Sequence, residues 1–137
     1  KPYRVFVLCG DGELDEGQNW EGMMSASKWN LENLIIIIDR NHVQLDGTEG
    51  QIMPLGNVRD KLEAFGFQVQ ECDGHDIEKL SESIQSAIDY QGPAAIIADT
   101  IKGKGVSFME GQAAWHGQLI GQTDYEQAIR ELKEGLL

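Results

Sequence analysis

An aspartate between two glycines follows directly after an apolar run, and an asparagine follows it after thirty positions: Gly10-Asp11-Gly12 and Asn41. Carboxylate and amide oxygens are hard ligands of the kind that Mg²⁺ prefers, and a backbone carbonyl from the loop after Asn41 would add a third. Flanking glycines allow a ligand to approach the backbone closely, and a following helix offers unpaired N–H groups to a phosphate. Because Asp11 would repel a phosphate, we expect a metal ion between them. Each signal by itself also fits a simple turn.

Further candidates stand in the last glycine-rich loop. Lys102 and Lys104 are conspicuous in an acidic chain, since a lysine ammonium suits a phosphate, although a solvated surface lysine is the commoner case. His116 follows a tryptophan, and an imidazole held there is suited to proton transfer near neutral pH, although a lone histidine is more often structural. For His42 and His75 the sequence predicts no role beyond that of loop residues.

Short apolar runs alternate with helical periods, which predicts an α/β fold with a mostly parallel sheet and flanking helices. The four isoleucines at 35–38 indicate a buried central strand. We expect strands at 3–9 (buried), 34–39, 67–72 and 94–99, helices at 16–29, 58–65, 77–90 and 125–136, and long loops at 41–57 and 102–122. Ligands of open α/β sheets bind beyond the carboxyl ends of the strands, and the candidate residues follow such ends.

The chain opens directly on an apolar run, whereas a parallel sheet normally has helices on both faces. We therefore expect residues 1–137 to form a single domain that is incomplete at its N-terminus. Its sheet should then have an uncovered apolar face, which is a natural interface.

The charge balance argues against general binding to nucleic acid or to an anionic membrane. The chain has 23 acidic residues against 11 basic ones and a net charge of -12, which repels phosphates. It has no signal-peptide pattern and no apolar run of the ~20 residues that a spanning helix needs. Cys9 and Cys72 lack zinc-ligand or CxxC spacing, so we expect reduced core thiols in a cytoplasmic protein.

Two stretches together resemble the thiamine-diphosphate motif of the transketolases: GDGELDEGQNWE at 10–21 and DRNHVQLDG at 39–47. The motif begins with Gly-Asp-Gly and ends in an asparagine that follows a strand. The resemblance extends over essentially the whole chain, and it is strongest to the N-terminal subunit of the split, two-gene transketolases. It implies a diphosphate-binding (PP-type) domain whose cofactors are thiamine diphosphate and Mg²⁺, or Ca²⁺ or Mn²⁺ in its place.

The resemblance also implies a role for individual residues. The metal ligands would be the side chains of Asp11 and Asn41 and the backbone carbonyl of Val43. The amide of Gly12 would bind the diphosphate, and Leu45 would lie against the cofactor rings. The full set implied to bind the cofactor is Gly10, Asp11, Gly12, Asn41, Leu45, Lys102 and His116.

His116 is implied to be catalytic, through proton transfer and contacts with the sugar hydroxyls. Glu16 and Glu21 match glutamates near the contact between subunits, where acidic pairs link the two active sites of the family's enzymes. Acidic residues near a helix N-terminus also have a simpler explanation, because they favour the helix dipole.

The implied function is that of a transferase subunit or fragment, which moves a two-carbon ketol unit between sugar phosphates as in the pentose phosphate pathway. The family's upstream segment and its pyrimidine-binding domain are absent from this sequence. We therefore expect a companion pyrimidine-domain chain, an oligomer, and no activity from this chain alone. Two alternatives remain. One is another thiamine-diphosphate enzyme, such as a deoxyxylulose-phosphate synthase or a 2-oxo-acid dehydrogenase component; the other is a non-catalytic cofactor-binding or assembly module.

Overall fold

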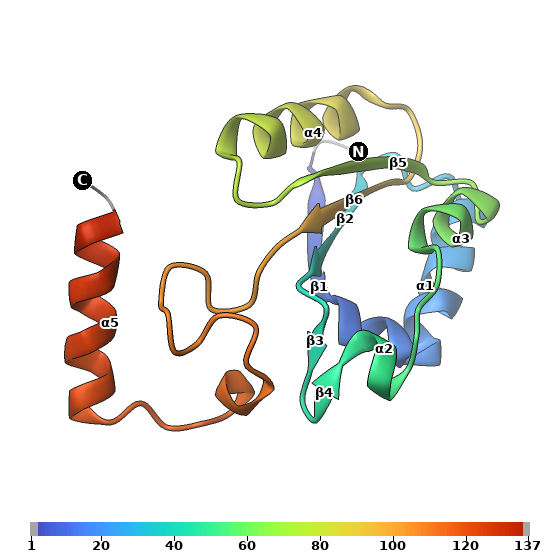
Figure 1. Cartoon of the computed structure of the whole chain (residues 1–137). Helices are drawn as coiled ribbons and strands as arrows, with labels where there is room; N and C mark the ends of the chain where they lie inside the picture. Colours follow the sequence, from blue (N-terminus) through green and yellow to red (C-terminus); the bar gives the residue numbers. More distant parts are fainter. Residues whose placement is uncertain (1–2, 136–137) are drawn as a thin grey trace.

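Four parallel strands form the centre of the structure, a computed structural model that describes residues 3–135 (Figure 1). The strands β1 (Val5–Gly10), β2 (Leu34–Arg40), β6 (Ala94–Asp99) and β5 (Gln68–Asp73) lie side by side in the order β1-β2-β6-β5. The isoleucine-rich strand β2 is central, as predicted. The carboxyl ends are in register, with Gly10 beside Asp39. The predicted α/β fold with a mostly parallel sheet is confirmed.

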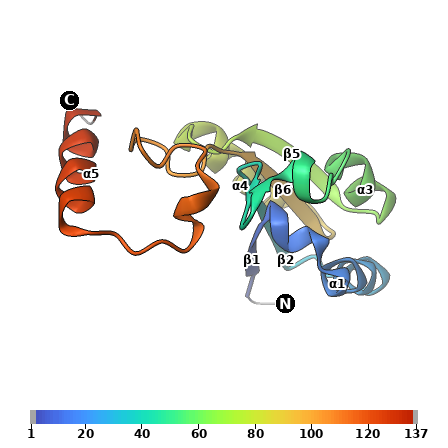
Figure 2. The same cartoon turned by 60° about the horizontal axis from the view of Figure 1, so that its bottom comes forward.

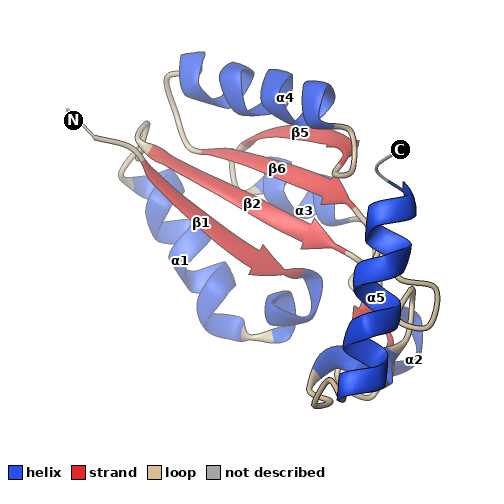
Figure 3. Ribbon diagram, turned by 90° about the vertical axis from the view of Figure 1, so that its left-hand side faces the viewer, coloured by secondary structure: helices blue, strands red, loops and turns tan. Residues whose placement is uncertain are grey.

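Helices cover the two faces of the sheet (Figure 3). On one face lie α1 (Gly17–Lys28) and α3 (Val58–Ala64), and on the other lies α4 (Ile77–Asp89). Alternate side chains of a strand point to opposite faces, so Ile36 belongs to the core beneath α1 and α3, whereas Ile35 belongs to the core beneath α4. A strand buried on both faces is a continuous apolar run, which is why β2 is so rich in isoleucine.

The prediction that the first strand is buried is wrong. β1 is an edge strand, and the side chains from Val5 to Leu8 are 38% to 71% exposed, whereas Cys9 is buried. Within residues 3–135, β1 pairs with β2 on one side only, so its apolar composition is not matched by burial. The uncovered apolar face that the sequence predicts for the sheet is present at this strand.

Short elements interrupt both of the predicted long loops. Between 41 and 57 lie β3 (Val43–Gln44), β4 (Gly47–Thr48) and α2 (Glu49–Ile52), and β3 pairs with β4 as an antiparallel hairpin. Two 3₁₀ helices were also not predicted: η1 (Asp11–Asp15) and η2 (Ala113–His116). Elements of two to five residues are too short for a hydrophobic period to reveal them.

The last helix, α5 (Gln122–Gly135), begins three residues before the predicted start. It stands away from the sheet in Figures 1 and 2, at the end of the long segment that follows β6. The amide and the hydroxyl of Ser107 donate hydrogen bonds of 2.6 and 2.8 Å to the carboxylate of Glu131, and these tie the helix to that segment. Position 136, the predicted end of the helix, lies outside the described residues. None of the helices in the described part of the chain has the length and apolarity needed to cross a membrane.

Candidate metal and diphosphate site

A cavity of about 470 Å³ lies at the carboxyl ends of β1 and β2, and the candidate residues meet there. Every residue assigned from the sequence to the metal or the cofactor lines it: Gly10, Asp11, Gly12, Asn41, Val43, Leu45, Lys102 and His116. Glu16 lines it as well, with Glu13 and Gln44, which the sequence did not single out for the site. Glu21 does not, because it is an exposed residue of α1 away from the cavity.

Asp11 is a buried acid at the base of this site, with 1% of its surface exposed. Its Oδ1 accepts a hydrogen bond of 2.8 Å from the amide of Gly12, and its Oδ2 accepts one of 2.6 Å from the amide of His42. Burial raises the pKa of this carboxyl, and these two amides oppose the rise. Among residues 3–135 no lysine or arginine forms an ion pair with Asp11, so two backbone amides and the nearby ring of His42 are the groups that favour its ionised form.

Asn41 is oriented by its neighbour at the end of β2. Its Nδ2 donates to Oδ2 of Asp39 at 3.3 Å, and its Oδ1 accepts from the amide of Val43 at 3.1 Å. The other carboxylate oxygen of Asp39 accepts a hydrogen bond from the hydroxyl of Thr100. The sequence analysis assigned no role to Asp39. Its place at the carboxyl end of a buried strand was the feature that could have indicated a role in the site.

The charges around the cavity fit a metal ion between protein and diphosphate. Asp11, Glu13 and Glu16 line it, and of the lining residues that the structure describes, Lys102 alone has a permanent positive charge. A diphosphate without a counter-ion would be repelled by these carboxylates. The carboxylate of Asp11, the amide oxygen of Asn41 and the carbonyl of Val43 are a hard oxygen set suited to Mg²⁺.

The backbone at Gly12 lies close to the hairpin. A Cβ at this position would be 3.1 Å from Cγ of Gln44, so a side chain here would press against the side chain of Gln44. Gln44 also donates a hydrogen bond of 3.0 Å from its Nε2 to Oδ2 of Asp15, in η1. This contact fixes the hairpin that carries Val43 and Leu45 against the turn that carries Asp11.

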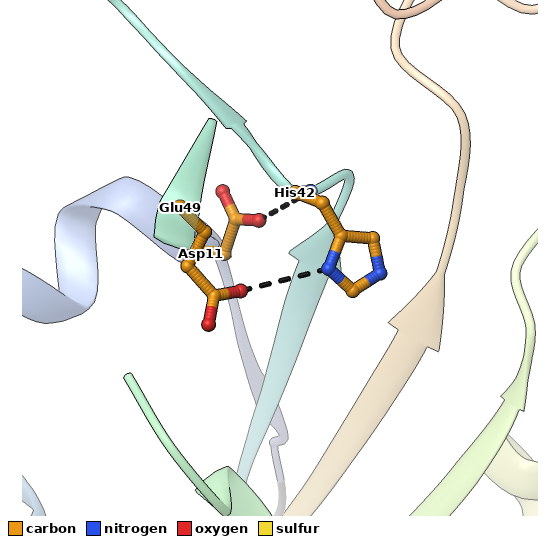
Figure 4. Close-up of side chains that lie close together, drawn as sticks. All are labelled: Asp11, His42 and Glu49. Atoms are coloured by element: carbon orange, nitrogen blue, oxygen red, sulfur yellow. Dashed lines mark hydrogen bonds and ion pairs between the residues drawn. The ribbon is translucent and has the colours of Figure 1, made fainter. Parts of the chain in front are cut away.

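Asp11, His42 and Glu49 form a second group of possible metal ligands (Figure 4), with one ligand atom of each within 4.8 Å of the others. His42 has a left-handed backbone (φ 60°), and its Nδ1 is 3.6 Å from Oε2 of Glu49. That oxygen is also 3.5 Å from Nε of Arg40, and Glu49 is 8% exposed. Arg40 and a protonated His42 would both neutralise Glu49, and the guanidinium opposes a metal cation beside it. The sequence predicted no role for His42 or Glu49.

The family described as the thiamine diphosphate-binding domain of transketolase matches residues 2–135. The chain belongs to this family. It is 43% identical over 134 residues to one subunit of the apulose-4-phosphate transketolase of Phocaeicola vulgatus. It is 42% identical over 136 residues to the 6-deoxy-6-sulfo-D-fructose transketolase subunit SqwG of a Clostridium species. The crystal structure of transketolase from Campylobacter jejuni superposes on the domain with a TM-score of 0.90 at 33% sequence identity.

The matched part of each relative is much shorter than the relative itself. The match to the Phocaeicola subunit includes 96% of this chain but only 47% of that subunit. The match to the Clostridium subunit includes 98% of this chain and 50% of that subunit. The domain spans 21% of the Campylobacter chain. The resemblance to the diphosphate-binding subunit of the split transketolases is confirmed by these relatives.

Replacing Asp11 with asparagine tests its carboxylate as a metal ligand. Because its pKa is raised in the fold, the ionised carboxylate destabilises the metal-free protein as the pH rises through that pKa. At neutral pH, metal-free Asp11→Asn should therefore unfold at the same temperature as the wild type or above it. Mg²⁺ with thiamine diphosphate should stabilise the wild type, by about 2.7 kcal/mol at a hundredfold excess over Kd, and should not stabilise the variant. Thermal unfolding with and without these ligands measures both effects.

Glu49→Gln is the matched control. It removes the acid of the second group and leaves Asp11, Asn41 and the Val43 carbonyl in place. Its unfolding temperature should still rise with Mg²⁺ and thiamine diphosphate. A response lost in Glu49→Gln and kept in Asp11→Asn would assign the metal to the group in Figure 4 instead.

Proposed function

We propose that residues 1–137 form one partial domain of a transketolase, which binds the diphosphate of thiamine diphosphate through Mg²⁺ for ketol transfer between sugar phosphates. The observation that carries the proposal is the single cavity that gathers Asp11, Asn41 and Val43 with Lys102 and His116. The match to the transketolase family supports the choice of cofactor. When bound, thiamine diphosphate serves as the electron sink for breaking the carbon–carbon bond beside a carbonyl.

The chain's own residues would hold the metal and the diphosphate. Asp11 and Asn41 would ligate Mg²⁺ through their side chains, and Val43 through its carbonyl. The hydrogen bond between Asn41 and Asp39 fixes the amide before the metal arrives, so little ordering is left to the binding step. Lys102 would add a positive charge beside the diphosphate.

Two residues at the cavity would contact other parts of the bound molecules. Leu45 is 62% exposed although it is apolar, which suits a side chain that supports the cofactor rings. His116 is exposed at the end of η2, and the preceding Trp115 packs edge-on against Phe108 with ring centroids 5.2 Å apart. This ring contact holds the segment, and so presents the imidazole for proton transfer with substrate hydroxyls.

The rest of the active site would come from a companion chain with the pyrimidine-binding domain, in a cytoplasmic oligomer. The names of the two relatives support a companion chain, since each is one subunit of a transketolase. Glu16 at the cavity and the exposed Glu21 on α1 are proposed to lie at the subunit contact. The names of the two relatives specify different substrates, apulose 4-phosphate and 6-deoxy-6-sulfo-D-fructose. An activity assay should therefore include these two compounds together with common ketose phosphates.

Lys102 and Lys104 form a matched pair for the diphosphate contact. Lys102 lines the cavity that holds Asp11, whereas Lys104 lines a different cavity. Lys102→Met should weaken Mg²⁺-dependent binding of thiamine diphosphate about ten- to hundredfold, the size expected for a hydrogen bond to a charged group. Titration calorimetry of the assembled protein measures the affinity. Equal affinities in Lys102→Met and Lys104→Met would remove Lys102 from the site.

His116→Ala tests the proton-transfer role. In the assembled enzyme, turnover should fall by about 10²–10⁴-fold, as is typical when a general acid or base is lost. The affinity for thiamine diphosphate should change much less, because the metal and the diphosphate have other ligands. Steady-state kinetics and a cofactor titration on the same preparation separate the two. A loss of turnover below about threefold contradicts a role in general acid–base catalysis.

The chain alone should not catalyse ketol transfer. It carries the residues for one end of the cofactor, and alignment of the reacting groups supplies a large share of such catalysis. The purified chain should be associated with itself or with a pyrimidine-domain chain, and turnover should require that companion. Light scattering and an assay with Mg²⁺, thiamine diphosphate and a ketose–aldose pair test both statements. A monodisperse monomer with turnover would overturn them, and a stable monomer without turnover would overturn only the association.

A further inference from the structure

The segment that carries Lys102 is held where it leaves the sheet. β5 and β6 end side by side, with Asp73 opposite Asp99. Just beyond these ends, the amide of Ile101 donates a hydrogen bond of 2.8 Å to Nε2 of His75. We propose that His75 is a positioning residue, which fixes Lys102 in the diphosphate cavity by holding the amide of the residue before it. The proposal rests on the proposed role of Lys102.

The turn that carries His75 is itself anchored at both ends. The amide of His75 donates to Oδ1 of Asp73 at 2.9 Å, at the end of β5. On its other side, Asp76 caps α4 by accepting hydrogen bonds of 3.1 Å from the amides of Glu78 and Lys79. For Nε2 to accept from Ile101, the proton of the ring must be on Nδ1. The acceptor that Ile101 requires is therefore presented by a rigid turn.

Gly74 allows this turn to lie against the segment. A Cβ at this position would be 2.5 Å from Cγ2 of Thr100 and 3.1 Å from Cβ of Ala98. The amide of Gly74 donates to the carbonyl of Asp99 at 2.8 Å. The turn thus binds the chain on both sides of Thr100, at Asp99 and at Ile101.

Thr100 links this clamp to the metal side of the cavity. Its amide donates to the carbonyl of Arg40 at 3.0 Å, and its hydroxyl donates to Asp39, the residue that orients Asn41. One short segment therefore touches both the support of a proposed metal ligand and the proposed diphosphate lysine. Loss of the hydrogen bond from Ile101 to His75 should therefore change the position of Lys102 more than that of Asp39, because Lys102 directly follows Ile101.

Residues of this segment line two different cavities. Lys102 lines the cavity of about 470 Å³, whereas Ile101, Lys104 and His75 line a neighbouring cavity of about 770 Å³. The acids of the larger cavity are engaged by the chain itself: Glu71 by Arg59 at 3.2 Å, Asp99 by the ring of His42 at 2.9 Å, and Asp73 by the amide of His75 at 2.9 Å.

Two substitutions separate the hydrogen bond from the presence of a side chain. In His75→Gln, the amide oxygen can occupy the place of Nε2 and accept from Ile101. In His75→Asn, the shorter side chain mimics only the Nδ1 position. Amide hydrogen exchange over residues 101–103, and the affinity for thiamine diphosphate with Mg²⁺ in the assembled protein, are measured for both variants and the wild type.

His75→Asn should exchange the amides of 101–103 faster and bind thiamine diphosphate more weakly, by about three- to tenfold in each case, the size of one lost hydrogen bond. His75→Gln should resemble the wild type, and exchange in β6 should stay unchanged in both. Equal exchange of the Ile101 amide in all three proteins overturns the proposal, as does faster exchange with unchanged cofactor affinity. If the wild type binds no thiamine diphosphate, the proposed function fails, and the exchange rates alone then decide whether His75 holds the segment.

Discussion

A carboxylate that is almost fully buried and has no cationic partner in the described chain is the constraint around which the site is arranged. The two carboxylate oxygens of Asp11 accept hydrogen bonds from two amides, one from Gly12 beside it and one from His42, after a different strand. The second bond requires β1 and β2 to end at the same level, which their register provides. His42, which donates this bond, has a left-handed backbone, an uncommon conformation for a residue other than glycine. A buried charge is costly, and a metal ion is the simplest group that would offset it.

Hydrogen bonds of polar side chains also connect the carboxyl ends of the other strands. Asp39 at the end of β2 binds Asn41 on one side and Thr100 on the other, and the chain just after Thr100 is bound by His75 from beyond β5. The segments that follow β2, β6 and β5 are therefore tied to one another by side-chain hydrogen bonds at the carboxyl edge of the sheet. A parallel sheet allows these bonds, because it brings the ends of segments that are distant in sequence to one edge. The loops that follow are then fixed at their first residues, whatever their length.

The sequence predicted the sheet and its main helices, because long apolar periods and strand ends are local signals. The expectation that Lys102 and His116 lie with Asp11 and Asn41 came from the family resemblance, and all four line one cavity. The sequence did not predict burial correctly for β1, since an apolar run does not say whether a neighbour covers it. It also missed the hairpin and the contacts of His42, Glu49 and His75. Their partners lie up to 57 positions away, as for His42 and Asp99, and nothing in a short stretch of sequence encodes such a pairing.

Two groups of exposed apolar side chains lie outside the cavity. Phe6 and Leu8 of β1 are 49% and 71% exposed, and Leu119 and Ile120, before α5, are 92% and 57% exposed. Burying apolar surface is worth about 25 cal/mol per Å², so a chain that covers either group gains stability. The proposed companion would do so while bringing the other half of the cofactor site. The residues that would bind the metal and the diphosphate are thus held by hydrogen bonds at the strand ends, whereas the exposed apolar groups outside the cavity offer surface to the proposed second chain.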